Sequence, residues 1–300
     1  MSTWKAVSGY IEVLAVVAAG FLGSQRTATA APASAVTLQR VYQPGQTLQY
    51  EMSGSNHGWN YQFHAESAAK QDSDGGWFEE FAWSNLRSNA PMEMSAESKA
   101  FHQRLSLSGE QKYLSVPDLS KVQPLLIGPI TDTLNFYADL FLAKKLGLTR
   151  VGQNAYFERG IPNSWADGTQ VLVGEDVIDF DLTLVGADPK AHTAELLVKH
   201  VPPKQQKLKL PASWMETPVR ALPNNWAQVI KSDGGFLVQV GMEVFEVHVT
   251  VDTRDGKIVA ARIHNPVVYV ERRCTDAALT QCAEPKPDEL VRDVSLILVR

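Results

Sequence analysis

The sequence has few cysteines and lacks the short motifs that mark common catalytic centres. Cys274 and Cys282 are its two cysteines in 300 residues. It contains no HExxH zinc motif, no GxSxG nucleophile turn, no GxxxxGK[ST] phosphate loop, no dinucleotide fingerprint and no CxxC pair. These absences argue against metalloproteases, hydrolases, nucleotide-dependent enzymes and thiol oxidoreductases, and they give no reason to expect a cofactor. An enzyme whose site is assembled from distant strands stays open.

Basic charge is also scarce. The chain has 28 Lys and Arg against 33 Asp and Glu, a formal net charge of −5, and no basic run. A mildly acidic chain of this kind is not expected to bind nucleic acid.

Long apolar runs are missing too. The longest at the N-terminus, residues 13–23, follows Lys5 and is too short to span a bilayer. We therefore expect residues 1–35 to be a signal peptide cleaved after Ala35, with the mature protein periplasmic or secreted. Glu12 interrupts the run, so an uncleaved anchor is the alternative. With no cysteine near the cleavage region, a lipid anchor is not expected.

The two cysteines are close together in a chain expected to leave the cytoplasm. An oxidising compartment favours a disulfide between Cys274 and Cys282. Zinc is poorly supported, because structural zinc normally takes four ligands and these two residues lie in no ligand cluster.

Most of the chain alternates apolar and polar residues with the period of two expected for β-strands that have one wet face. One helix is predicted over residues 132–146, capped by Thr131 or Asp132 and ended by Gly147. We expect a mainly β protein, with a curved antiparallel sheet or half-barrel built from two meanders and the helix on its concave side. Residues 36–300 would form one domain, which could be a duplication of 36–150 and 151–300.

The clearest local signal is a hairpin over residues 242–272, around the turn Arg254-Asp255-Gly256. Only a bulged turn with Gly256 in the left-handed conformation keeps one face of both strands apolar. This register places Glu246 opposite His264 and His248 opposite Arg262. The four side chains have the chemistry of an acid–base or anion site. A solvated face with ordinary cross-strand pairs is the more common meaning of such a pattern.

Two tryptophans follow similar Pro-Asn turns, in residues 162–166 and 223–227. Trp165 and Trp226 are expected in loops, where they could form a contact surface. Core packing is the more frequent role of tryptophan.

Several stretches resemble a group of exported bacterial proteins of unknown function found in Acidobacteria. They are PGQ at 44–46, LIGPITD at 126–132, PNSWADG at 162–168, PNNW at 223–226 and CTDAALTQC at 274–282. The resemblance spans nearly the whole mature chain. It implies export, and it transfers no activity, cofactor or site residue.

Three functions follow as hypotheses. The first is a cell-envelope protein that binds an apolar or amphipathic ligand beneath the helix. The second is an interaction module that uses the tryptophan-bearing loops. The third is an enzyme that uses the face carrying Glu246, His248, Arg262 and His264; the sequence favours a binding role over an enzymatic one.

Overall fold

The computed structural model describes residues 35–56, 58–89, 93–108, 113–115, 117–158, 170–171, 179–201, 212–216, 224–232 and 234–300. Residues from position 34 onward form one compact unit. The predicted cleavage region, apart from Ala35, and Trp165 lie outside the described residues.

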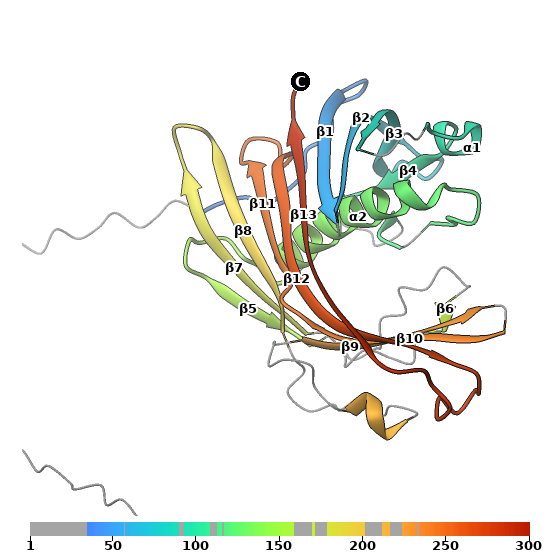
Figure 1. Cartoon of the computed structure of the whole chain (residues 1–300). Helices are drawn as coiled ribbons and strands as arrows, with labels where there is room; N and C mark the ends of the chain where they lie inside the picture. Colours follow the sequence, from blue (N-terminus) through green and yellow to red (C-terminus); the bar gives the residue numbers. More distant parts are fainter. Residues whose placement is uncertain are drawn as a thin grey trace, which may run out of the picture. The chain divides into compact units, whose positions relative to one another are not determined.

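Thirteen strands join into one antiparallel sheet that is curved and does not close. The main path runs β4-β3-β2-β1-β13-β12-β11-β8-β7-β5, and β10 branches off the far half of β12 to pair with β9, which also pairs with β6 (Figure 1). The strands are β1 Thr47–Asn56, β2 Trp59–Gln71, β3 Trp77–Ser88, β4 His102–Leu105, β5 Asn154–Phe157, β6 Gln170–Val171, β7 Asp179–Asp188, β8 Thr193–Val201, β9 Asn224–Ser232, β10 Gly235–Glu243, β11 Glu246–Asp252, β12 Ile258–Cys274 and β13 Lys286–Leu298.

The last strand joins the two ends of the sequence. β13 lies between β1 and β12, so the N-terminal meander and the C-terminal hairpin become neighbours in one sheet. The two meanders predicted from the sequence therefore share a continuous hydrogen-bonded ladder. This confirms the expected mainly β fold with a curved, open sheet.

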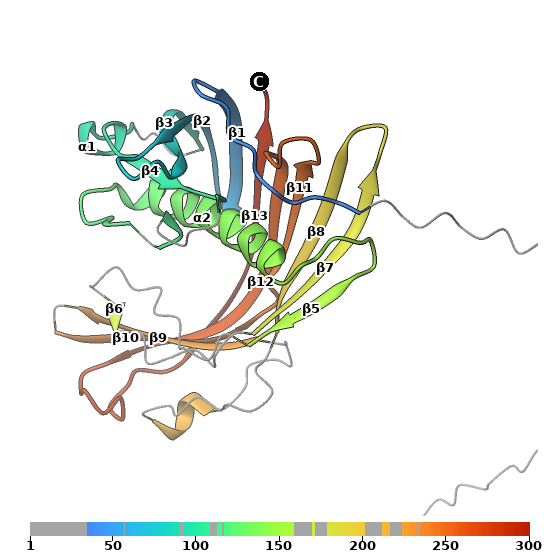
Figure 2. The ribbon, with the colours of Figure 1, turned by 180° about the vertical axis from the view of Figure 1, so that it is seen from behind.

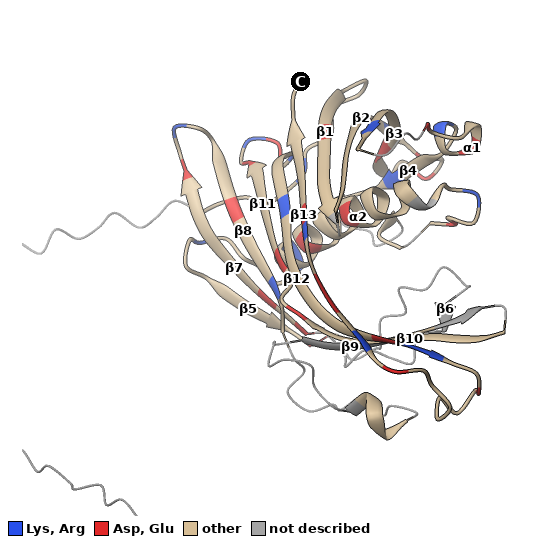
Figure 3. Cartoon of the chain, in the orientation of Figure 1, with Lys and Arg blue, Asp and Glu red and all other residues tan. Residues whose placement is uncertain are grey.

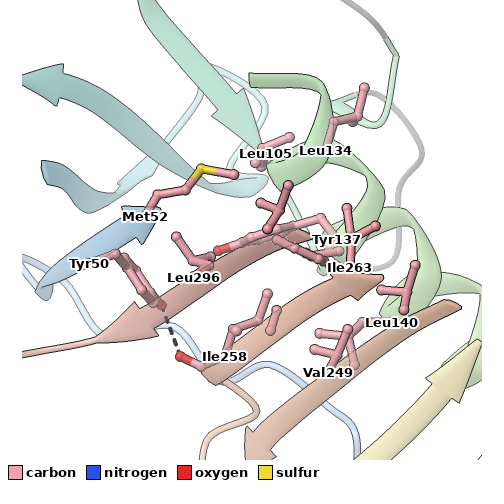
Figure 4. Packing of buried hydrophobic residues seen from close by; sticks show 14 of the residues in the cluster. Tyr50, Met52, Leu105, Leu134, Tyr137, Leu140, Val249, Ile258, Ile263 and Leu296 are labelled. Atoms are coloured by element: carbon pink, nitrogen blue, oxygen red, sulfur yellow. Dashed lines mark hydrogen bonds between the residues drawn. The ribbon is translucent and has the colours of Figure 1, made fainter. Parts of the chain in front are cut away.

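Helix α2, Pro124–Lys145, packs on the concave face of the sheet (Figure 2). Leu134, Tyr137 and Leu140 are buried against strand residues such as Val249 and Ile263 (Figure 4). Tyr50 and Met52 on the first strand and Val294 and Leu296 on the last strand are buried in the same core.

The helix begins earlier than the sequence analysis predicts. Its N-cap is Gln123 rather than Thr131 or Asp132, and Pro124 occupies the first turn. Pro129 stands inside the helix, where its missing N–H leaves the Leu125 carbonyl without its usual helical donor. Three prolines within residues 117–129 hide the helical pattern of this stretch in the sequence. The predicted end is correct, since Leu146 is the C-cap and Gly147 has a φ of +71°.

Two further differences concern the strands around the hairpin. The predicted strand 242–252 is broken at residues 244–245, so that its first two residues belong to β10. Trp226 lies in strand β9, not in a loop as predicted, because Gly235–Glu243 pairs with Asn224–Ser232 and draws Asn224, Asn225 and Trp226 into the ladder. A short helix α1, Ala96–Lys99, lies between β3 and β4.

A smaller cluster of buried residues lies at the other end of the sheet. Cys274 and Cys282 form the predicted disulfide. Buried around it are Ala212, Met215, Val229, Val238 and Leu279. The 3-10 helix η2, Ser213–Glu216, contributes to this cluster, and Trp214 Nε1 donates a hydrogen bond to the Leu279 carbonyl at 2.8 Å. In the described part of the chain, no helix combines the length and apolarity needed to cross a bilayer.

Candidate functional site

The predicted hairpin brings Glu246, His248, Arg262 and His264 together on one face. Glu246 pairs with His264 and His248 pairs with Arg262, as the sequence register predicts. This is the face opposite helix α2, since the intervening residues Val247 and Ile263 are buried in the core. The strand pair therefore presents its four polar side chains away from the helix.

The turn differs in one detail from the predicted register, which places Val251 opposite Val259. In the structure Val251 pairs with Ile258, and the register shifts between Thr250 and Val251. The extra residue is thus Val259, within β12. Gly256 has the expected left-handed conformation, with a φ of +69°.

Neighbouring strands extend the polar face on both sides of the hairpin. On one side, β13 and β1 place Asp293 opposite His264 and Ser295 between Arg262 and Ser53. On the other side, β8 places Lys199 opposite Glu246. The Ser53 and Ser295 hydroxyls are 2.8 Å apart. Five adjacent strands thus contribute polar groups, and Figure 3 shows acidic and basic positions mingled across β8, β11, β12 and β13.

An open trough of about 700 Å³ lies on this face. Its walls come from β1, β2, β11, β12 and β13. The lining residues are Ser53, Gly54, Ser55, Asn60, Tyr61, Glu246, His248, Arg262, Ile263, His264, Asp293, Val294 and Ser295. All four residues singled out from the sequence line the trough.

Each histidine is oriented by a carboxylate. His248 Nδ1 lies 2.7 Å from Glu195 Oε1, and His264 Nδ1 lies 2.7 Å from Asp293 Oδ1. Because a carboxylate only accepts hydrogen bonds, each Nδ1 carries a proton and donates it. Nε2 is then the nitrogen left for another partner, as in sites where a second group fixes the imidazole tautomer.

The Arg262 guanidinium lacks a hydrogen-bond acceptor on its own strand pair. One guanidinium nitrogen lies 3.3 Å from His248 Nδ1. His248 Nδ1 already donates its proton to Glu195, so it cannot also accept a hydrogen bond from Arg262. The nearest carboxylate is that of Glu195, which forms a long ion pair with the guanidinium at 4.0 Å, beyond hydrogen-bond range. Within the described residues Arg262 therefore has no good acceptor, and 64% of its side chain is exposed.

Glu246 is held in its charged form. Lys199 Nζ lies 2.8 Å from Glu246 Oε1. The hydrogen bond from Lys199 lowers the pKa of the Glu246 carboxyl. A carboxylate in this state can accept hydrogen bonds from a ligand, and it is poorly suited to act as a general acid.

Several contributors were not singled out from the sequence. Asp293, Glu195 and Lys199 alternate correctly with buried neighbours on their own strands, so their exposure is readable from the sequence. Their position beside the hairpin is not, because it depends on which strands pair across long stretches of chain. In the sequence, each of them is only a polar position in an alternating strand pattern, as many other strand residues are.

Other candidates receive no support as a site. No group of three or more His, Cys, Asp or Glu side chains in the described ranges is arranged to hold a metal ion. Trp165 lies outside those ranges, and Trp226 is placed only by its backbone in β9.

Comparison with known proteins does not identify a family. No family model matches the chain, and no curated protein matches it either. The resemblance noted from short stretches of sequence therefore stays a prediction, and the function must be argued from the trough.

Proposed function

We propose that this is a binding protein that takes a polar, anion-bearing ligand into the trough. The observation that carries the proposal is the state of Arg262, whose guanidinium lines the trough with no good acceptor among the described residues. Guanidinium groups form strong, paired hydrogen bonds with carboxylates and phosphates. The serine hydroxyls and the two oriented imidazoles beside it supply further donors and acceptors.

The apolar or amphipathic ligand expected from the sequence has weaker support. Its expected location is the concave face, where helix α2 buries Leu134, Tyr137 and Leu140 against the sheet. These side chains occupy the apolar surface that such a ligand would need. The proposal therefore places the ligand on the opposite, polar face.

An enzymatic role for the same face also has weaker support. The His264 and Asp293 side chains are 54% and 58% exposed. Catalytic groups usually act where water is largely excluded, because the protein's electrostatic interactions are then stronger. An open, hydrated trough suits reversible binding better.

For location, we propose export to the periplasm or the medium. The Cys274–Cys282 disulfide supports this, since disulfides persist in oxidising compartments. The signal peptide predicted over residues 1–35 supplies the route. Edman sequencing of protein secreted by its host would check the predicted start at Val36.

The binding test uses the chain from Val36 onward with D-glucuronate as the probe and D-glucose as its neutral counterpart. Isothermal titration calorimetry at low ionic strength measures both. We expect binding of glucuronate and little binding of glucose. Arg262→Gln should weaken glucuronate binding by at least roughly ten-fold, because a hydrogen bond to a charged group contributes about 1.5–3 kcal/mol.

The matched control is Arg150→Gln, which removes an exposed arginine from the turn after α2 and leaves the trough intact. It should bind glucuronate like the wild type. Equal weakening in both variants would mean that overall charge is responsible, and the proposal would then fail.

A further inference from the structure

Two histidines give the trough a charge that depends on pH. His248 and His264 both line it, on adjacent strands. Their side chains are 22% and 54% exposed, so both imidazoles can exchange protons with water. Imidazole ordinarily gains or loses its charge between about pH 5 and about pH 8. Each Nδ1 already donates to a carboxylate, so the proton that is gained or lost is the one on Nε2.

Fixed charges surround the two imidazoles on strands β8, β11, β12 and β13. They are the carboxylates of Glu195, Glu246 and Asp293 and the cationic groups of Lys199 and Arg262. From β1 and β2 the lining takes hydroxyl and amide groups and the phenol of Tyr61. Burial raises the pKa of Tyr61, so this phenol stays neutral. While both imidazoles are neutral, the carboxylates around them therefore outnumber the cations by one.

This excess of negative charge opposes an anionic ligand. Protonation of one imidazole cancels the excess, and protonation of both gives the trough a net positive charge. Opposite charges attract and like charges repel at these distances, so an anion binds more tightly to the protonated trough. Because the coupling between two bound species is reciprocal, binding of the anion in turn favours uptake of protons.

The two imidazoles differ in their neighbours. His264 pairs with Glu246 on β11 and with Asp293 on β13, so acidic side chains lie on both sides of it. His248 pairs with Arg262, and a guanidinium nitrogen lies 3.3 Å from its Nδ1. A positive charge on His264 thus lies between carboxylates, whereas one on His248 also faces another cation. His264 should therefore contribute the larger part of the pH dependence.

We infer that anion binding in the trough is coupled to proton uptake by His264 and His248, so that the ligand is captured in acidic surroundings and released as the pH rises. The inference rests on the proposed function and adds to it the condition under which the site fills.

Isothermal titration calorimetry of glucuronate provides the test, with the chain from Val36 onward between about pH 5.5 and about pH 8. Glucuronate stays a carboxylate throughout this range. Uptake of one proton per ligand changes the affinity about ten-fold per pH unit. We expect binding at least roughly ten-fold tighter at the acidic end of the range. Titrations in two buffers with different ionisation enthalpies should show net proton uptake by the complex.

Two substitutions remove the titrating groups. His264→Asn and His248→Asn each eliminate Nε2 and keep a side-chain N–H that can donate to the neighbouring carboxylate. The double variant should bind glucuronate at every pH with the weak affinity that the wild type has at the alkaline end. His264→Asn alone should remove more of the pH dependence than His248→Asn alone. Melting temperatures of the variants establish that they fold.

His102→Asn is the matched control. His102 is also exposed beside a carboxylate, with Nδ1 3.3 Å from Glu80 Oε1, and it lies on β4 outside the trough. This variant should retain the full pH dependence.

Three results overturn the inference: equal affinity at both ends of the pH range, no proton uptake by the wild type, or a pH dependence that survives in the double variant. If Arg262→Gln still weakens glucuronate binding, the anion site stands in each of these cases. Absence of glucuronate binding by the wild type at every pH overturns both the inference and the proposed function.

Discussion

Arg40 and Glu79 form an ion pair that is almost completely buried. Arg40 Nε donates to Glu79 Oε1 at 2.8 Å, and both side chains are 1% exposed. Arg40 also donates to the Gln46 side chain at 2.8 Å and to the Asp255 carbonyl at 3.3 Å. One guanidinium thus ties the segment before β1 to β3 and to the β11–β12 turn.

Removing one partner of this pair should be far more harmful than removing both. Arg40→Met leaves the Glu79 charge buried without a partner and should cost about 3–5 kcal/mol. Arg40→Met combined with Glu79→Met should recover a large part of that loss, because no charge is then left in the core. Urea denaturation of the two single variants and the double variant measures the coupling. Additive losses would show that the pair is not coupled.

Gly256 is required for two separate reasons. Its φ of +69° disfavours side chains, and a Cβ there would lie 2.3 Å from the Gln39 carbonyl oxygen. Gly45 shares the first property, with a φ of +73°, but a Cβ at that position would meet nothing within 4 Å. We expect Gly45→Ala to cost about 1–2 kcal/mol, the usual penalty of the left-handed conformation.

Gly256→Ala should cost clearly more than Gly45→Ala, because the Gln39–Arg40 backbone must also move. Melting temperatures and urea midpoints of the two variants compare them directly. Equal losses would mean that the segment before β1 adjusts freely, contrary to its tight contact with the turn.

The contact between Gly256 and Gln39 could not be predicted from the sequence, although the hairpin around Gly256 could. Alternation in residues 245–264 was enough to place Glu246 opposite His264, because a one-residue slip would expose an apolar face. Gly256 followed from the turn chemistry. Its approach to Gln39 depends on a segment far away in the chain, and no local pattern carries that information.

The same limit explains the partly predicted site. Four trough residues were found because they lie on one hairpin. Asp293 and Ser53 were missed as partners because β13 inserts between the first strand and that hairpin. The start of α2 was missed for a different reason. Pro124 suits the first turn of a helix, and Pro129 loses only one backbone hydrogen bond, so burial of Leu126 and Ile130 outweighs that loss.

The Cys274–Cys282 disulfide should stabilise the end of the sheet that carries β9 and β10. It closes a loop with a sequence separation of 8. Loop-closure entropy for a ring of this size corresponds to about 2–3 kcal/mol. The double variant Cys274→Ser, Cys282→Ser should therefore melt at a lower temperature than the wild type. A reducing agent should bring the wild type down to the level of the variant and leave the variant unchanged; a reductant effect on the variant would contradict this assignment.

Arg292 compensates buried acidic groups where α2 meets the sheet. Its guanidinium contacts the Asp132 carboxylate, which is buried on α2. Burial lowers the pKa of Arg292, whereas Asp132 and, more weakly, Glu243 raise it. Asn265 Nδ2 donates a hydrogen bond to the Glu243 carboxylate at 2.9 Å. Burial raises the pKa of both the Asp132 and the Glu243 carboxyl, against the lowering effect of Arg292. Asp132 is buried, whereas Glu243 and Arg292 each keep part of their surface exposed, so the buried charge that Arg292 compensates is chiefly that of Asp132.

Replacing Arg292 should make stability strongly dependent on pH. A carboxyl whose pKa is higher in the folded state than in the unfolded state stabilises the fold when protonated, at pH below its ordinary value near 4. That contribution is lost as the pH rises through the folded-state pKa. Without Arg292 both carboxyls are raised further, so Arg292→Met should be close to the wild type near pH 4 and lose about 3–5 kcal/mol near pH 7. Adding Asp132→Asn to this variant should flatten the dependence. A loss in Arg292→Met that is constant from pH 4 to pH 7 would show that the guanidinium acts through packing and not through its charge.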